Sequence, residues 1–330
     1  MQLNNILISR TDSIGDVVLT LPMAGVIKEH YPNSKIFFLG RTYTKPIVSC
    51  SNYVDEFVNY DDLSSKDIEK QVYLINQLNI DAAIHVFPKK EIASLFKKSN
   101  VKYRIGTSHR MYHILTCNKL VNFSRKKSEL HESQLNLKLL SGINIESNKS
   151  LDELALLNEF NLIEKLPKNL SSLISEKKKN IIFHPKSKGS AVEWGVENFN
   201  KLAELLPLED YNIFITGTKE EGQLIESYLI KKENIFNLTG KMNLNELVLF
   251  ISKVDILLAC STGPLHIAAS TGVNALGVFS NRRPIHPGRW RPIGRRVKVF
   301  TYNKESNINI DDQMKLISPS EIFNYIKTLD

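Results

Sequence analysis

Residues 254–270 read VDILLACSTGPLHIAAS, an apolar run followed by a polar turn and a series of small residues. The apolar run predicts a buried strand, and the small residues after the turn predict a helix. A helix that begins directly after a strand presents unpaired backbone N–H groups and a partial positive charge, so anions bind there. The stretch therefore predicts an α/β fold with a phosphate site at the turn.

The side chains of the turn suit this role. Ser261 and Thr262 can cap the helix or donate hydroxyls, Gly263 lets a ligand approach the backbone, and Pro264 suits a first helical turn. His266 is near enough along the chain to reach the same ligand. An ordinary capped helix with a buried histidine is the competing interpretation, and the rest of the chain decides between the two.

Strand and helix patterns alternate on both sides of this stretch. Strands are expected at 5–9, 34–40, 57–60, 81–86 and 102–105, and then at 180–184, 211–216, 254–259 and 274–279. Helices are expected at 17–30, 65–78, 90–97 and 129–140, and then at 196–206, 220–231, 244–253, 263–271 and 319–329. Such alternation predicts parallel sheets with helices on both faces.

The chain is long enough for two domains, because its 330 residues exceed the usual size of one core. Between about 142 and 179 the periodic pattern weakens into sequence rich in Asn, Ser, Glu and Lys, as in a passage between domains. We expect two doubly wound, Rossmann-like domains, residues 1–165 and 175–330, that face a central cleft with ligands at the carboxyl ends of the strands. The last helix is expected to pack back toward the first domain.

Composition limits the cellular setting. The hydrophobic and charged fractions, 42% and 24%, are those of a soluble globular protein. Three scattered cysteines fit neither a disulfide framework nor a metal cluster, which favours a reducing compartment. No window approaches the ~20 apolar residues of a membrane span, and the N-terminus lacks a signal peptide. A cytoplasmic location is therefore expected.

The net charge of +8 indicates anionic partners. Phosphorylated small molecules, an anionic membrane surface and nucleic acid all fit a basic protein. Nucleic acid ranks last, because the basic residues are not interleaved with stacking aromatics and no nucleic-acid motif is present.

The loop after the first strand, residues 10–18, reads RTDSIGDVV. It stands where a dinucleotide-binding fold has its glycine fingerprint, but it offers only Gly15, so nicotinamide chemistry has no support. The loop offers acids and hydroxyls instead. Asp16 is either a carboxylate in the first turn of a helix or a base that takes a proton from a hydroxyl.

Two polar loops follow strands of the second half. Lys186, Ser187 and Lys188 follow one strand, and they form either a diphosphate site or a solvated loop. Glu220 and Glu221 follow the next strand, and they either accept the hydroxyls of a ribose or act as ordinary acids at a helix start.

Residues 281–296 contain six arginines, Arg289 among them, together with prolines, glycines and Trp290. A structured loop of this kind could bind phosphates of an acceptor or a donor, or face an anionic membrane leaflet. Trp194 and Phe199 are expected to form a packing anchor with no chemical role.

Five segments, taken in their order and spacing, carry a resemblance to a known family. They are residues 6–22 (ILISRTDSIGDVVLTLP), 131–132 (HE), 194–195 (WG, with Phe199), 261–269 (STGPLHIAA) and 289–294 (RWRPIG). Together they resemble glycosyltransferase family 9, the ADP-heptose:lipopolysaccharide heptosyltransferases, over nearly the whole chain.

The resemblance implies the GT-B fold, with the acceptor bound mainly by the first domain and the nucleotide sugar by the second. It implies metal-independent transfer with inversion at the anomeric carbon, no cofactor, and ADP-heptose as the donor. The implied acceptor is the anionic inner core of lipopolysaccharide, reached by an enzyme that is peripheral at the cytoplasmic face of the inner membrane.

The same resemblance assigns roles to residues. Asp16 matches the general base, and Glu221 or Glu220 matches the carboxylate that holds the ribose. Thr262, Gly263 and His266 match the positions that hold the diphosphate, and Arg10 matches a basic position of the N-terminal motif. Beside the resemblance, donor contacts are also expected from Lys186, Ser187, Lys188 and Ser261, and acceptor or phosphate contacts are expected from Arg10, Ser13, Gly15 and Arg289.

Two positions depart from the family pattern. Ser261 stands where the heptosyltransferases have an Asp, and Val192 stands where they have a Lys two residues before the tryptophan. Lys186 or Lys188 is expected to supply the missing charge. The departures leave open another nucleotide-sugar transferase, a nucleotide-sugar epimerase, or a catalytically silent nucleotide-binding assembly protein.

Overall fold

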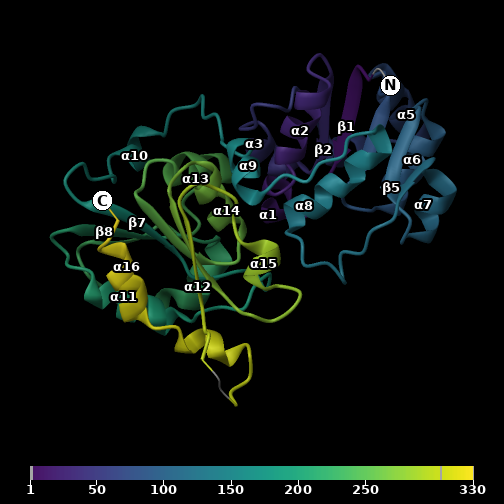
Figure 1. Cartoon of the computed structure of the whole chain (residues 1–330). Helices are drawn as coiled ribbons and strands as arrows, with labels where there is room; N and C mark the ends of the chain where they lie inside the picture. The colour runs from purple at the N-terminus through teal and green to yellow at the C-terminus, as the bar shows by residue number, and fades with distance from the viewer. Residues whose placement is uncertain (1–2, 305–306, 330) are drawn as a thin grey trace. The chain divides into compact units, whose positions relative to one another are not determined.

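The computed structural model describes residues 3–304 and 307–329. The chain divides after Asn161 into two compact units (Figure 1). This boundary lies near the end of the expected first domain. The expected passage at 142–179 holds two helices that the sequence pattern did not predict, α9 (Leu151–Leu156) and α10 (Lys168–Ser171).

The first unit is built on a six-stranded sheet in which every pair of neighbours is parallel. Its strands are β1 (Asn5–Ser9), β2 (Lys35–Gly40), β3 (Glu56–Asn59), β4 (Ala82–His85), β5 (Tyr103–Thr107) and β6 (Lys119–Val121), in the order β3-β2-β1-β4-β5-β6. The prediction of a parallel sheet is confirmed. The sequence pattern did not predict β6, a three-residue edge strand.

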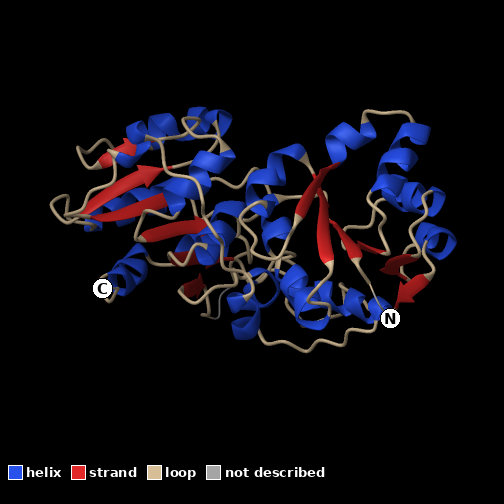
Figure 2. Ribbon diagram, turned by 90° about the horizontal axis from the view of Figure 1, so that it is seen from above, coloured by secondary structure: helices blue, strands red, loops and turns tan. Residues whose placement is uncertain are grey.

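Helices cover both faces of the sheet in each unit (Figure 2). In the first unit they are α1 (Ile14–Val18), α2 (Pro22–His30), α3 (Lys45–Val48), α4 (Tyr60–Ser64), α5 (Ile68–Gln77), α6 (Lys90–Lys98), α7 (Met111–Thr116), α8 (Glu132–Leu137) and α9, with 3-10 turns η1 (Thr42–Thr44) and η2 (Lys138–Ile143). The core between sheet and helices is aliphatic and aromatic, with Leu7, Phe37 and Phe96 buried in it.

The single helix expected at 17–30 is instead two helices. Pro22 has no N–H to donate to the Val18 carbonyl and lies in the first turn of α2, so the regular helix is interrupted at residues 19–21, although the N–H groups of Leu19 and Leu21 still bond the Gly15 and Val17 carbonyls. The start of α1 also differs from the prediction: it begins three residues earlier, at Ile14, and Asp16 lies in its first turn. The helix expected from 65 begins only at Ile68, because Asp67 is its N-cap and accepts the N–H of Lys70 at 2.8 Å.

The second unit repeats the same topology. Its parallel strands are β7 (Lys179–His184), β8 (Tyr211–Ile215), β9 (Ile235–Asn237), β10 (Ile256–Cys260), β11 (Asn274–Phe279) and β12 (Val297–Thr301), in the order β12-β11-β10-β7-β8-β9. Its helices are α10, α11 (Val196–Leu205), α12 (Lys219–Ile225), α13 (Leu244–Ile251), α14 (Gly263–Ser270), α15 (Pro287–Trp290) and α16 (Pro319–Ile326), with η3 (Glu226–Tyr228) and η4 (Asp312–Leu316). The edge strands β9 and β12 were not predicted.

Trp194 is the packing anchor that the sequence suggested. Its ring is fully buried, lies edge-on to Phe199 at 5.0 Å between centroids, and donates its indole N–H to the Ile317 carbonyl at 3.0 Å. The last helix, α16, packs against α11, and Ile322 and Ile326 are buried in the same core. The apolar face of the helix is thus used within the second unit, and its predicted packing toward the first domain stays a prediction.

Each sheet reverses its strand order once, between β1 and β4 and between β7 and β10. In doubly wound sheets, ligands bind outside the carboxyl ends of the strands at this switch point. The loop that carries Asp16 follows β1, and the turn before α14 follows β10. Among the described residues, no helix has the length and hydrophobicity required to span a bilayer.

Candidate active site

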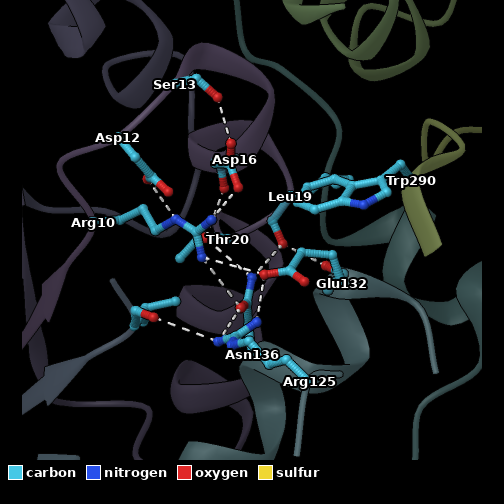
Figure 3. A network of polar contacts seen from close by, with 12 residues as sticks. Arg10, Asp12, Ser13, Asp16, Leu19, Thr20, Arg125, Glu132, Asn136 and Trp290 are labelled. Atoms are coloured by element: carbon cyan, nitrogen blue, oxygen red, sulfur yellow. Dashed lines mark hydrogen bonds and ion pairs between the residues drawn. The ribbon is translucent and has the colours of Figure 1, made fainter. Parts of the chain in front are cut away.

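The side chain of Arg10 organises the loop after β1 (Figure 3). Its Nε donates to Asp12 Oδ1 at 2.6 Å, and a terminal nitrogen donates to Asp16 Oδ1. Ser13 Oγ donates to the other oxygen of Asp16, Oδ2. The Asp16 carboxylate is therefore held on both oxygens, while 18% of its side chain remains exposed. It is an oriented carboxylate with access to solvent at the carboxyl edge of the sheet.

Behind this carboxylate lies a second buried ion pair. The remaining terminal nitrogen of Arg10 is 3.5 Å from Glu132 Oε1 and 3.4 Å from Asn136 Oδ1, both on α8. Arg125 also donates to Glu132 Oε1, and it donates to Asn136 Oδ1 at 3.0 Å and to the Val86 carbonyl at 3.4 Å. The two guanidinium groups thus share one carboxylate and one amide oxygen, and they connect the loop after β1 with α8 and the end of β4.

These charges control one another's protonation. Burial opposes the charged form of Arg10, but the carboxylates of Asp12, Asp16 and Glu132 outweigh it and hold the pKa of Arg10 above its usual value. Burial, assisted by the Asp16 charge, raises the pKa of Asp12 to about 6, although Arg10 opposes this shift. Arg10 therefore stays charged in the network throughout the physiological pH range.

The break between α1 and α2 fixes the helix that carries Asp16. The Leu19 carbonyl accepts no backbone hydrogen bond from the described residues of these helices. It accepts hydrogen bonds from Ser133 Oγ at 2.5 Å and from Asn136 Nδ2 at 3.3 Å. Thr20 Oγ1 donates to the Asp16 carbonyl at 2.8 Å and accepts from Asn136 Nδ2 at 3.1 Å. Side chains of α8 thus hold the end of α1.

His85 lies at the end of β4, directly beside Ser9 of β1. It is 1% exposed, its ring lies 5.3 Å from Phe96 and 5.2 Å from His113, and neither ring nitrogen has a hydrogen-bond partner among the described residues. Burial, with a smaller contribution from His113, lowers the pKa of His85 from 6.5 to about 3. The ring is therefore neutral in the folded protein.

This pKa shift predicts acid sensitivity. The unfolded chain binds a proton at His85 with a pKa near 6.5, whereas the folded chain binds it only near 3. Protonation of His85 therefore leaves the free energy of unfolding unchanged above pH 6.5 and lowers it progressively as the pH falls from 6.5 toward 3. In a His85→Leu variant, the thermal midpoint should fall less steeply with decreasing pH than in the natural protein. The exposed His109 offers the control, because His109→Leu should keep the natural pH dependence. Parallel pH profiles for His85→Leu and the natural protein would contradict the assignment.

In the second unit, α14 begins directly after β10, as predicted. Thr262 is its N-cap residue and is 6% exposed, yet its side chain makes no capping hydrogen bond and its Oγ1 has no partner among the described residues. Gly263 opens the helix, Ser261 is half-buried before it, and His266 is buried in its first turns. A buried hydroxyl that satisfies no backbone group at a helix N-terminus is available to a bound anion.

A pocket of about 500 Å³ opens beside β7 and β8. It is lined by Lys186, Lys188, Gly189, Glu193, Thr218, Glu220, Glu221 and Leu224. The predicted lysines and glutamates of the second half therefore converge on one cavity within the same unit.

Glu221 fixes the shape of this pocket. Its Oε2 accepts the Thr218 N–H at 2.8 Å in a capping box, and its Oε1 accepts the Lys188 N–H at 3.2 Å. Lys188 has a left-handed backbone (φ 50°), which a non-glycine residue rarely adopts. Glu220 beside it is exposed, and hydrogen bonds from its own backbone N–H and from Thr218 lower its pKa. A carboxylate and an ammonium group thus stand at the same opening.

Several predicted site residues are engaged within the protein. Lys186 pairs with Glu193, and the N–H and Oγ of Ser187 both lie 3.0 Å from Glu193 Oε1. Arg10 and Ser13 hold Asp16, so their contacts favour a positioning role over the predicted acceptor or phosphate binding.

Two further residues were expected to contact an acceptor or a phosphate, Gly15 in the first loop and Arg289 in the arginine-rich segment. Gly15 lies inside α1 next to Asp16. The guanidinium of Arg289 lies over the Trp290 ring, 5.3 Å from its centroid, in the short helix α15.

Five residues of these sites were not predicted. They are Asp12, Arg125, Glu132 and Asn136 in the first unit, and Glu193 in the second. Glu132 belongs to the His-Glu pair that forms part of the family resemblance, but the sequence assigned no role to it. Arg125 and Asn136 carry no signal in the sequence. Asn136 meets Arg10 across 126 positions of the chain, and Arg125 reaches Glu132 and Asn136 from an irregular loop whose course the sequence pattern does not predict. Over residues 3–304 and 307–329, no three side chains of His, Cys, Asp or Glu are placed to hold a metal ion.

Comparison with known proteins identifies the family of the chain. The family model described as glycosyltransferase family 9 (heptosyltransferase) matches residues 75–317. The chain is 26% identical over 324 residues to a Haemophilus influenzae protein provisionally named as a glycosyltransferase, which covers 94% of this chain and 93% of that protein. It is 22% identical over 306 residues to the lipopolysaccharide core heptosyltransferase OpsX of that species, with coverage of 90% and 85%.

The fold agrees as well. The solved structure of the Escherichia coli ADP-heptose lipopolysaccharide heptosyltransferase II superposes with a TM-score of 0.78 at 16% identity, and the match covers 99% of this chain and 98% of that one. That likeness shows the predicted GT-B architecture of two Rossmann-like domains. The chain belongs to glycosyltransferase family 9 and is a glycosyltransferase of the heptosyltransferase type.

Proposed function

We propose that this glycosyltransferase moves a heptose from ADP-heptose to the inner core of lipopolysaccharide, with inversion and with Asp16 as the general base. The observation that carries the proposal is the Asp16 carboxylate, which is oriented by Arg10 and Ser13 and still reaches solvent. The names of two similar proteins support the substrates: OpsX is a lipopolysaccharide core heptosyltransferase, and the Escherichia coli enzyme is named for ADP-heptose.

In the proposed reaction, an acceptor hydroxyl donates a hydrogen bond to Asp16. As its oxygen attacks the anomeric carbon, the proton passes to Asp16 and the bond from that carbon to the diphosphate breaks. ADP leaves with the bonding electrons. The first turn of α14 and the hydroxyl of Thr262 stabilise the negative charge that develops on the diphosphate. The proposed reaction needs no metal ion and no cofactor.

The nucleoside part of the donor is assigned to the 500 Å³ pocket. Each oxygen of Glu221 accepts one backbone N–H, which leaves lone pairs for the ribose hydroxyls, and Glu220 is the alternative at the same opening. Lys188 supplies the charge that Val192 does not, since Lys186 is already paired with Glu193. We also place the protein at the cytoplasmic face of the inner membrane, where its acceptor is anchored.

Thr262→Val tests the diphosphate site. The substitution keeps the shape of the side chain and removes a buried hydroxyl that has no partner in the described part of the chain, so thermal stability should stay equal or rise. A hydrogen bond to a charged group contributes ~1.5–3 kcal/mol, so affinity for ADP should fall by roughly 10-fold to 100-fold. Calorimetric titration with ADP measures the effect.

The matched control is Thr271→Val at the other end of the helix. Thr271 Oγ1 donates to the Ala268 carbonyl at 3.0 Å and lies away from the N-terminus of α14. Its loss should leave ADP affinity unchanged. Equal affinities for the Thr262 variant and the natural protein would remove Thr262 from the donor site.

The identity of the donor is tested by titrating ADP, UDP, GDP and CDP and then the matching sugar nucleotides. Selective binding of ADP and ADP-heptose supports the proposal. Preference for another nucleotide would mean that the enzyme is a glycosyltransferase with a different sugar nucleotide as its donor. Turnover of the sugar nucleotide without an acceptor would indicate an epimerase. Nucleotide binding without Asp16-dependent turnover would indicate a silent assembly protein.

A further inference from the structure

The positive charge of the chain is concentrated in one segment of the first unit. Residues 97–128 contain nine of the 43 lysines and arginines and none of the 35 aspartates and glutamates. The rest of the chain therefore has a slight excess of acids. The segment runs from the end of α6 through β5, α7 and β6 to the loop before α8.

The helix at the centre of this segment presents apolar side chains to solvent. Met111, Ile114 and Leu115 of α7 are 84%, 57% and 72% exposed, whereas His113 on the opposite side is fully buried. Residues spaced by three and four positions share one face of a helix, so these three side chains form a continuous apolar surface. We call it the α7 face. A grouping of large apolar side chains of this kind marks a surface that binds a partner.

Exposed cations flank the α7 face along the chain. Arg110 directly precedes it, Lys119 lies on the edge strand β6 next to the exposed Leu120, and Lys126 and Lys127 follow in the next loop. All four cations are exposed, and none forms an ion pair with a described residue. The segment therefore combines an exposed apolar helix face with exposed positive charges before and after it.

The α7 face lies toward the edge of the sheet where Asp16 lies. In a parallel sheet all strands end at one edge, so Thr107 at the end of β5 and the loop that leads to Met111 lie at the same edge as the loop after β1. β4 alone separates β1 from β5, a spacing of ~10 Å. In Figure 1, α7 lies beside α6 and β5.

We propose that the α7 face docks the enzyme on an anionic lipid bilayer. Met111, Ile114 and Leu115 enter the boundary between headgroups and acyl chains, and the flanking lysines and arginine contact the acidic headgroups. The apolar side chains favour a bilayer over a soluble anion, since they need hydrocarbon and offer no hydrogen bonds. The docking rests on the proposed function for its purpose, because it brings the carboxylate of Asp16 to the surface where a lipid-anchored acceptor is found.

Cosedimentation of the full chain with vesicles tests this docking. The natural protein should bind vesicles of phosphatidylglycerol and phosphatidylethanolamine, bind phosphatidylcholine vesicles much less, and be released by salt. The triple variant Met111→Ser, Ile114→Ser, Leu115→Ser should bind the acidic vesicles at least about tenfold more weakly. The triple variant Lys119→Gln, Lys126→Gln, Lys127→Gln should weaken binding by more than about tenfold and reduce its salt dependence.

The control carries the same change at three other exposed apolar residues: Ile163→Ser, Leu208→Ser and Leu316→Ser. This variant should bind as the natural protein does. Equal vesicle binding by all variants, or no binding by the natural protein, would overturn the proposal. Self-association that depends on Met111, with no vesicle binding, would overturn it in favour of a second copy of the chain. Since vesicle binding needs neither donor nor acceptor, failure of docking and failure of the proposed reaction are distinguishable.

Discussion

Asp16→Asn should lower the rate of heptose transfer by about 10²-fold to 10⁴-fold while ADP binds with unchanged affinity. The amide keeps the size of the side chain but cannot accept the proton of the acceptor hydroxyl. The network can accommodate asparagine, because the amide oxygen can still accept a hydrogen bond from Arg10 and the amide NH2 can donate to Ser13 Oγ. The rate of ADP release from ADP-heptose in the presence of acceptor measures transfer, and calorimetry with ADP measures the donor site.

Asp12→Asn is the matched control for this experiment. Asp12 bonds the same guanidinium at 2.6 Å through Nε, and its side chain is exposed to a similar extent, but Ser13 Oγ bonds Asp16 and not Asp12. Its replacement should change the rate by only a few fold at neutral pH. Equal losses in the two variants would assign the effect to the charge balance around Arg10, and full activity of Asp16→Asn would remove Asp16 from the mechanism.

Arg10→Met should destabilise the first unit by about 3–5 kcal/mol, the typical cost of breaking a buried ion pair from one side. The variant leaves Asp12 and Asp16 without their guanidinium in a region where Arg10 itself is 3% exposed, and Glu132 loses Arg10 while it keeps Arg125. Asp16 also loses the contact that orients it, so transfer should fall as well. Because the chain has two units, urea unfolding followed by hydrogen exchange in residues 3–161 assigns the loss to the first unit.

Lys35→Met gives the scale for comparison. Lys35 pairs with Glu56 at 2.7 Å in the same unit, but both side chains are more than 40% exposed. Exposed pairs contribute ~0–1 kcal/mol, so this variant should be nearly neutral. Arg10→Lys should restore little of the stability, because one ammonium cannot reach the three carboxylates that the planar guanidinium joins. A small effect of Arg10→Met, similar to that of Lys35→Met, would show that the network contributes little to folding.

The central strands of both sheets could be predicted, because each is an apolar run bounded by polar turns. The edge strands β6, β9 and β12 could not, since strands of three residues, or strands with a lysine such as Lys298, carry too little pattern. The break between α1 and α2 was readable from Pro22. The sequence pattern nevertheless favoured one long helix, because apolar residues continue through 17–21.

The place of a site residue in the fold could be predicted where it depends on the residue's own loop, while its role stays a prediction. Thr262 and Glu221 lie at helix starts that follow strands, and such positions are visible in sequence. The partners of Arg10 on α8 were hidden, since Arg10 and Asn136 are 126 positions apart and come together only through the order of the strands. For the same reason Arg10 was interpreted as a ligand contact, whereas the fold surrounds it with carboxylates.

The helix that carries Asp16 has only five residues, too few to be stable alone, and Pro22 prevents it from joining α2. Its orientation is therefore decided by α8, through the hydrogen bonds of Ser133 and Asn136 to the Leu19 carbonyl. As a consequence, the position of the proposed base depends on two stretches that lie far apart in the sequence, residues 10–20 and 125–136. We expect that a change in residues 125–136 can shift Asp16 without contacting it, and that a second change in residues 10–20 can restore its position.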